Sequence, residues 1–96
     1  MTEVRREDGR FVFTDGAAEA ELLFERDGDR LVLVHTGVPD ELGGRGVGGA
    51  LVRAAVEWAG KTGLTVVPWC PFTRRWLRDH PDVAREATID WSGRPS

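Results

Sequence analysis

The N-terminal part of the chain contains three short stretches in which apolar residues alternate with polar ones or follow one another directly. This pattern is typical of β-strands and predicts them over residues 10–14, 18–25 and 31–38. Asp15-Gly16 and Asp27-Gly28-Asp29 stand between these stretches and are typical of tight turns. The uninterrupted apolar run of residues 31–34 further predicts that the third strand is buried on both faces. We therefore expect the chain to begin with antiparallel strands.

The central part of the chain has a helical period instead. Residues 47–61 place a broad apolar face at 3.6-residue spacing, made of Leu51, Val52, Ala55, Val56, Trp58 and Ala59. Gly63 is the expected C-terminal stop, and residues 64–68, rich in β-branched side chains, predict a short strand after it. A strand, a helix and a strand in this order predict a parallel strand pair joined by a right-handed crossover.

The C-terminal part predicts a second helix from Pro71 to about His80, with Phe72 and Trp76 on one face. Residues 87–91 are expected to form either a last strand or a packed tail, and residues 91–96 a frayed tail. No repeat, low-complexity segment or linker divides the chain. We therefore expect one domain over residues 1–96.

Composition narrows the functional classes. The formal net charge is −3, whereas a general nucleic-acid binder is expected to be basic. No apolar run is long enough for a membrane-spanning helix. A single cysteine cannot form an internal disulfide, which favours a reducing, cytoplasmic location. His35, Cys70 and His80 are scattered and do not have the spacing of a metal site.

The most informative motif is a loop directly before the central helix, with glycines at positions 43, 44, 46, 48 and 49. Such a loop lets backbone N–H groups converge on an anion, most often a phosphate, at the positive end of a helix. A P-loop is excluded, because Ala50-Leu51 follows where lysine and a hydroxyl residue are needed. Gly44, Gly46 and Gly49 fit a dinucleotide-binding fingerprint, but residues 39–42 separate them from the strand. A coenzyme A pyrophosphate clamp and a loop without a ligand remain as alternatives.

Three separated motifs extend this interpretation: His35-Thr36-Gly37-Val38-Pro39-Asp40-Glu41-Leu42, Gly63-Leu64-Thr65-Val66-Val67-Pro68-Trp69-Cys70-Pro71-Phe72 and His80-Pro81. With the glycine loop between the first two, they resemble the GNAT N-acetyltransferase superfamily, and most closely its short stand-alone branch with a Pro-x-Cys-Pro-Phe motif. The resemblance covers about residues 32–81. It implies an α/β (α+β) fold, in which a mixed, mostly antiparallel sheet contains a parallel, splayed strand pair and is joined by two main helices.

The resemblance also implies how acetyl-coenzyme A is bound. The pantetheine arm is expected between the splayed strands, paired with the backbone near Thr36 and Val38. The pyrophosphate is expected on the loop, namely on Gly43, Gly44, Arg45, Gly46, Val47, Gly48 and Gly49. The superfamily usually has Gln or Arg where this chain has Gly43, and Arg45 either supplies that charge or is a solvated loop residue. Arg74 and Arg75 either contact the 3′-phosphate or belong to a solvated helix face.

Two residues are candidates for the chemistry. Cys70 follows a strand and precedes Pro71 at the expected start of the second helix, where the helix N-terminus lowers the pKa of a thiol. It could protonate the departing coenzyme A thiolate, take up the acetyl group covalently, or only pack. His35, at the strand edge, is a candidate base or a structural histidine bonded to Thr36 or a loop.

The resemblance implies transfer of an acetyl group from acetyl-coenzyme A to an unidentified amine, on a small molecule or a protein, by a monomer or weak dimer. The chain has no tyrosine, which the superfamily commonly uses as the acid beside the thiol. It also lacks room for the usual substrate-binding half. Both departures favour an alternative, a non-catalytic acyl-coenzyme A binding or regulatory module. A third interpretation, a nucleotide-binding interaction domain, predicts that nucleotides without pantetheine bind equally well.

Overall fold

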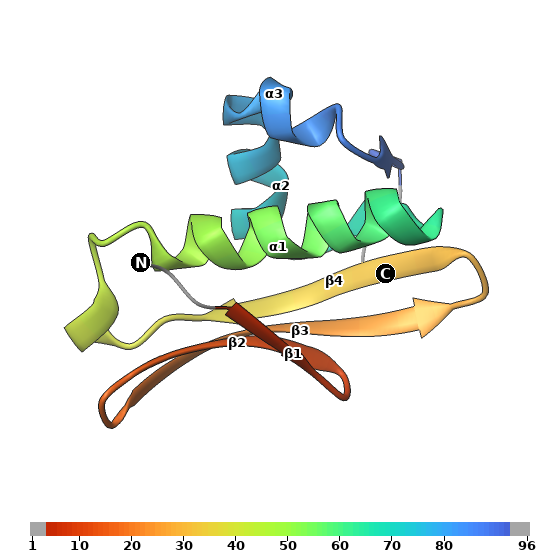
Figure 1. Ribbon diagram of the computed structural model, residues 1–96. Coiled ribbons are helices and arrows are strands. Elements are labelled where there is room, and N and C mark those ends of the chain that lie inside the picture. The colour runs from red at the N-terminus through yellow and green to blue at the C-terminus, as the bar shows by residue number, and fades with distance from the viewer. Residues whose placement is uncertain (1–3, 93–96) are drawn as a thin grey trace.

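The computed structural model of the chain describes residues 4–92, which form one six-stranded sheet and the helices packed on it (Figure 1). The strands are β1 (Val4–Glu7), β2 (Arg10–Asp15), β3 (Ala18–Asp27), β4 (Arg30–Gly37), β5 (Thr65–Pro68) and β6 (Thr88–Ile89). The helices are the 3₁₀ turn η1 (Asp40–Leu42), α1 (Val47–Thr62), α2 (Pro71–Asp79) and α3 (Pro81–Ala84). Strands β1 to β4 are antiparallel, whereas β4, β5 and β6 are parallel, in the order of the chain. The predicted mixed, mostly antiparallel sheet with two main helices is confirmed.

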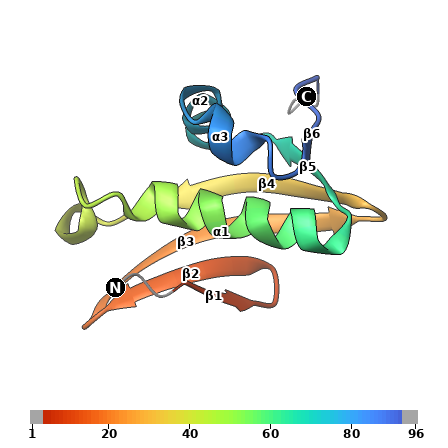
Figure 2. The same ribbon diagram turned by 45° about the horizontal axis from the view of Figure 1, so that its top comes forward.

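Helix α1 lies lengthwise across the sheet, and α2 and α3 lie beside it on the same side (Figures 1 and 2). The core between these layers joins the inner faces of the strands to α1, to Leu77 of α2 and to Val83 of α3. Trp58 of α1 is partly buried and packs on Phe11 and Phe24 of the sheet. The apolar period of α1 therefore directs this helix onto the sheet. Within residues 4–92, no helix is long and apolar enough to cross a membrane.

The strand predicted to be buried on both faces is buried on one. Leu31 and Leu33 are fully buried in the core, whereas Val32 and Val34 are only partly buried. The expectation is wrong because the described helices cover a single face of the sheet (Figure 1). A continuous apolar run does not by itself distinguish a covered face from an open one.

The two ends of the described chain hold short strands that are defined by their pairing. β1 contains one apolar residue in four, and its pairing with β2, from Glu7–Arg10 to Val4–Phe13, defines it as a strand. Near the C-terminus, the alternative of a last strand is confirmed, because β6 pairs with β5. The Trp91 carbonyl oxygen accepts a hydrogen bond from Arg74, so the expected frayed tail is held at this point. Its residues 93–96 lie outside the described part of the chain.

β4 and β5 diverge toward the end of the molecule that carries the glycine loop. Their pairing ends at Leu33 and Pro68, and the N–H groups of Trp69 and Cys70 donate to the Leu33 carbonyl oxygen at 3.1 and 3.0 Å. β4 continues to Gly37, still paired with β3. Among the residues described, the backbone of 34–37 therefore has no strand partner on the β5 side. This confirms the predicted splayed parallel pair.

Candidate functional site

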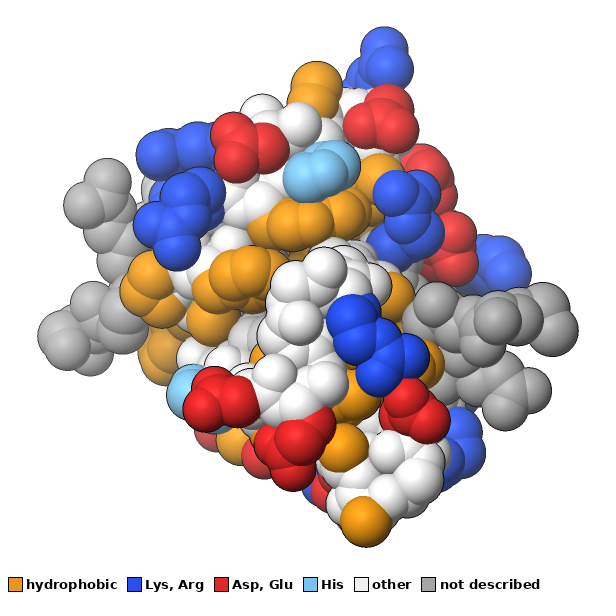
Figure 3. Space-filling model, turned by 90° about the vertical axis from the view of Figure 1, so that its left-hand side faces the viewer, with side chains coloured by type: hydrophobic (Ala, Val, Ile, Leu, Met, Phe, Trp, Pro, Cys, Tyr) orange, Lys and Arg blue, Asp and Glu red, His pale blue; other side chains and the backbone are white. Residues whose placement is uncertain are grey.

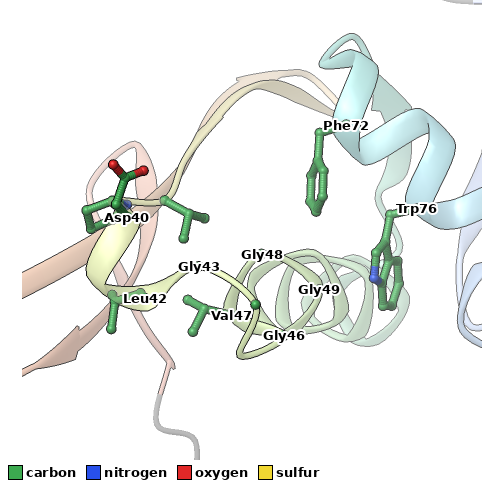
Figure 4. Close-up of a pocket in the computed structure, with 12 residues that line it drawn as sticks. Asp40, Leu42, Gly43, Gly46, Val47, Gly48, Gly49, Phe72 and Trp76 are labelled. Atoms are coloured by element: carbon green, nitrogen blue, oxygen red, sulfur yellow. The ribbon is translucent and has the colours of Figure 1, made fainter.

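A groove opens between the glycine loop and α2, where β4 and β5 diverge (Figures 3 and 4). Its volume is about 380 Å³. The lining comes from residues 38–40, 42–44 and 46–49 of one continuous segment, and from Phe72 and Trp76 of α2. On this face, hydrophobic side chains border a surface of backbone and uncharged residues (Figure 3). The groove therefore has aromatic rings on one side and exposed backbone on the other.

Two glycines give the loop a path that other residues rarely take. Gly44 and Gly46 have φ values of +76° and +74°, in the left-handed region where a Cβ atom is strained. Gly46 is the N-cap of α1, and the first bond of the helix runs from the Ala50 N–H to the Gly46 carbonyl oxygen at 3.0 Å. The N–H groups of residues 47–49 therefore have no acceptor within the described chain. Free N–H groups at the positive end of a helix are donors of the kind that bind anions in proteins.

Gly43 differs from the other loop glycines. Its φ is −65°, and its N–H donates to the Asp40 carbonyl oxygen at 3.0 Å, which closes η1. Leu42 beside it is buried in the core and anchors the turn. The Gly43 N–H, a predicted contact of the pyrophosphate, is thus hydrogen-bonded within the protein.

Gly48 and Gly49 allow close helix packing in addition to exposing their N–H groups. A Cβ atom on Gly48 would lie 2.8 Å from Cζ of Phe72, and one on Gly49 would lie 2.5 Å from Nε1 of Trp76. The two rings of α2 therefore rest on the first turn of α1, where no larger residue fits. Sequence reasoning places Phe72 and Trp76 on one helix face but does not identify them as groove walls. The available signal is their i, i+4 spacing together with two adjacent glycines at the start of another helix.

The three arginines expected as candidates for phosphate contacts do not line the groove. Arg45 forms an ion pair with Asp15 at 2.7 Å, and both side chains are about half exposed. Arg74 donates to the Trp91 carbonyl oxygen at 2.9 Å. Arg75 is exposed. The groove is therefore lined by exposed backbone and by none of these three cationic side chains.

Cys70 lies where β5 ends and is the N-cap of α2. The residue is 5% exposed and does not line the groove. Its Sγ atom lies 3.5 Å from Oγ1 of Thr36. Burial raises the pKa of the thiol, but hydrogen bonds from Thr36, Thr73 and the first N–H groups of α2 outweigh it and hold the pKa below its ordinary value. The position therefore favours the thiolate, as a helix N-terminus is expected to do.

Thr73 is a residue of this cluster that sequence reasoning does not identify. It is fully buried in α2, and its Oγ1 atom lies 3.4 Å from Oγ1 of Thr36. Two hydroxyls and one thiol thus meet between the free end of β4 and the start of α2. The available signal is spacing, because Thr73 stands three residues after the N-cap Cys70, where helix geometry turns a residue back toward the cap.

His35 lies apart from this cluster. It is exposed and pairs with Leu23 on β3, whereas the adjacent Thr36 contacts Cys70. Because neighbouring strand residues point to opposite faces, His35 lies on the helix-free face of the sheet. The structure thus does not bring His35 and Cys70 together. In the part of the chain that is described, no three His, Cys, Asp or Glu side chains are grouped to hold a metal ion.

Comparison with known proteins assigns the family. The family model described as GCN5-related N-acetyl-transferase matches residues 10–86. Protein NATD1 of Gallus gallus and Protein NATD1 of Mus musculus are each 35% identical over 63 residues, which make up 65% of this chain and 57% of theirs. The chain thus matches little more than half the length of these relatives. A GCN5-like protein from Staphylococcus aureus, solved by NMR, has a TM-score of 0.72 and 30% identity, covering 94% of this chain and 92% of that one. Since the family model covers most of the sequence and the fold agrees, this chain belongs to the GCN5-related N-acetyltransferase family.

Proposed function

We propose that this chain transfers an acetyl group from acetyl-coenzyme A to an amine. The observation that carries the proposal is the row of unbonded N–H groups at residues 47–49, which lies in a groove beside the free end of β4. A diphosphate suits these donors, because it places negative charge at a helix N-terminus. Membership of the family supports acetyl-coenzyme A as the ligand that brings this diphosphate.

The chain's own residues fit this donor in two places. The N–H groups of residues 47–49 would hold the diphosphate. The β4 backbone near Thr36, which has no strand partner on the β5 side, would hold the amide groups of the pantetheine arm. Val38 lines the groove directly after β4, so the two places are continuous. When bound, acetyl-coenzyme A supplies the acetyl group as a thioester.

Cys70 is assigned as the proton donor for the sulfur that leaves. The amine nitrogen attacks the thioester carbonyl carbon, the carbon–sulfur bond breaks, and the sulfur must take up a proton. A thiol with a lowered pKa gives up its proton readily, and the hydroxyls of Thr36 and Thr73 stabilise the thiolate left behind. Cys70 regains a proton from solvent before the next cycle.

His35 is assigned to the acceptor side. It lies on the helix-free face, beside the part of β4 that has separated from β5. An amine that approaches from this face meets His35 before it reaches the gap between the two strands. Imidazole is the commonest general base in proteins and would take up the amine proton. The two candidate chemical groups then act from opposite sides of β4.

The motif around Cys70 bears on the branch of the family to which the chain is assigned. Pro68-Trp69-Cys70-Pro71-Phe72 places the end of β5, the N-cap thiol and one groove wall in five consecutive positions. We take this as support for the branch of the family with a Pro-x-Cys-Pro-Phe motif. A single domain that acts as a monomer or weak dimer in the cytoplasm remains part of the proposal.

One observation favours a second candidate function, a non-catalytic module that binds acyl-coenzyme A. Cys70 is 5% exposed and lies outside the groove lining. The chain also has no tyrosine that could replace it as the acid. Such a module would use the same groove and the same N–H groups but would release its ligand unchanged.

One assay separates the two candidates. The protein is incubated with acetyl-coenzyme A and a panel of primary amines, and free coenzyme A and acetylated amine are measured by mass spectrometry. We expect transfer by the wild type and a loss of about a hundredfold or more in Cys70→Ala, because general acid–base groups contribute on that scale. Binding of acetyl-coenzyme A without product from any amine would indicate the binding module. Full turnover by Cys70→Ala would reduce the cysteine to a packing residue.

A further inference from the structure

Trp76 carries a hydrogen-bond donor that the binding mode described above does not use. Its ring is part of the groove wall, and its nitrogen edge is turned toward Gly49 and the interior of the groove (Figure 4). A Cβ atom on Gly49 would lie 2.5 Å from Nε1 and 2.9 Å from Cε2 of the ring. The indole N–H therefore lies over the first turn of α1, next to the unbonded N–H groups of residues 47–49.

This N–H is open to the groove rather than sealed in the core. Trp76 is partly buried, and none of the described residues accepts a hydrogen bond from its Nε1 atom. No side-chain nitrogen or oxygen that is shut off from solvent in the described chain lacks a partner. An indole nitrogen can only donate, and a tryptophan at a partly buried position usually finds an acceptor for it. A ligand oxygen in the groove would be such an acceptor.

The ring is held in place before any ligand arrives. His80 stacks on it, with ring centroids 3.8 Å apart and an interplanar angle of 12°. The His80 Nδ1 atom lies 2.7 Å from the Trp76 carbonyl oxygen, which fixes the imidazole against the indole. The missing side chain of Gly49 leaves room for the nitrogen edge. A donor fixed in this way loses little conformational entropy when it forms its bond.

We propose that the Trp76 indole N–H donates a hydrogen bond to the diphosphate of bound coenzyme A, so that Trp76 selects phosphate-bearing donors. The inference rests on the proposed acetyl-coenzyme A site. Two other candidate donors of the loop are already engaged within the protein, since Arg45 is paired with Asp15 and the Gly43 N–H is bonded to Asp40. One side-chain donor from α2 then completes a set of backbone donors on α1.

Trp76→Phe removes the N–H and keeps an aromatic ring. Calorimetry measures the affinities of the wild type and this variant for coenzyme A and for acetyl-pantetheine, which has no phosphate. We expect the affinity of Trp76→Phe for coenzyme A to fall about tenfold or more, because a hydrogen bond to a charged group is lost, while its affinity for acetyl-pantetheine changes less than about twofold. An equal loss for both ligands would make Trp76 a packing residue, and unchanged affinity for coenzyme A would also overturn the inference.

Two further variants sharpen the comparison. Trp58→Phe is the matched control, because Trp58 packs on Phe11 and Phe24 and does not line the groove. It should leave both affinities unchanged.

Gly49→Ala keeps the indole but displaces its nitrogen edge, because the added Cβ atom would lie 2.5 Å from Nε1. It should reproduce the selective loss for coenzyme A, and full affinity in this variant would contradict the assigned geometry.

NMR of the wild type gives a test that does not depend on the folding of a variant. The indole N–H signal of Trp76 should move downfield when coenzyme A is added and should move little with acetyl-pantetheine. If coenzyme A binds and this signal stays in place, the inference is wrong while the proposed function stands. If the wild type binds no coenzyme A, the proposed function fails, and the inference fails with it.

Discussion

The Oγ1 atom of Thr36 lies 3.5 Å from the Sγ atom of Cys70, which joins the free end of β4 to the N-terminus of α2. The contact exists because β4 continues beyond Leu33 and Pro68, its last pair with β5. Thr73 reaches the same point from within α2. A thiol that burial alone would keep protonated is therefore surrounded by donors that favour its charged form.

Replacing Thr36 by valine is expected to raise the pKa of Cys70. The substitution removes one of the hydrogen bonds that stabilise the thiolate, while the burial that raises the pKa remains. The rate of Cys70 alkylation by iodoacetamide, measured against pH by mass spectrometry, should move to higher pH in Thr36→Val. Thr36→Ser keeps a hydroxyl and should retain the wild-type curve. Superimposable curves for the wild type and Thr36→Val would show that Thr36 does not stabilise the thiolate.

Gly46→Val tests the loop at the start of α1, and Gly63→Val at the end of the same helix is its matched control. Both glycines have a φ of +74°, so a side chain should cost about 1–2 kcal/mol of stability at either position. Only Gly46 lines the groove. Gly46→Val should therefore lower the affinity for acetyl-coenzyme A by more than about tenfold, and Gly63→Val should not, in calorimetric titrations of the folded variants. Equal affinities of the two variants for acetyl-coenzyme A would show that the glycine loop does not contribute to the binding site.

Gly60→Ala tests how α1 packs on the segment that follows α3. A Cβ atom at this position would clash with the Glu86 carbonyl oxygen. Alanine ordinarily stabilises a helix over glycine by about 1 kcal/mol, but a backbone carbonyl cannot rotate away as a side chain can. We expect the free energy of unfolding in urea to fall by about 1–3 kcal/mol. Glu57→Ala, at an exposed position of α1, should change it by less than about 0.5 kcal/mol, and a stabilised Gly60→Ala would contradict the packing.

Asp90 is expected to make stability depend on acid pH. Hydrogen bonds from Ser92 and from the Arg30 guanidinium lower the pKa of this carboxyl from 3.8 to about 2. Because the folded-state pKa is below the unfolded one, the stabilisation is present above pH 3.8 and is lost as the pH falls through about 2. The melting temperature of Asp90→Asn should therefore lie below that of the wild type near neutral pH. The two should converge as the pH falls toward about 2, and a gap that persists there would contradict the assignment.

Most of the fold follows from local patterns. The apolar face of α1, the left-handed Gly63 at its end and the turn glycines Gly16 and Gly28 are all readable from residue type and spacing. Strand β1 cannot be read from residue type and spacing, because its strand character comes from pairing with β2 rather than from its own composition. The number of buried faces of β4 is not readable either, since it depends on where the helices lie.

The glycine loop before α1 is readable from the sequence, but the separate role of each glycine is not. Gly46 exposes backbone, Gly43 closes a turn, and Gly48 and Gly49 also accommodate rings from α2. These roles differ because of contacts with residues distant in sequence, and such contacts cannot be read from the amino-acid sequence alone. The same holds for Arg45, whose partner Asp15 is the last residue of β2.

Calorimetric titration with acetyl-coenzyme A, and with ATP under the same conditions, tests the central claim most directly. Both ligands carry phosphates that the N–H groups at the start of α1 could bind. Only acetyl-coenzyme A has a pantetheine arm that can use the free edge of β4. The account predicts micromolar binding of acetyl-coenzyme A and much weaker binding of ATP. No binding of acetyl-coenzyme A, or equal binding of the two ligands, would contradict it.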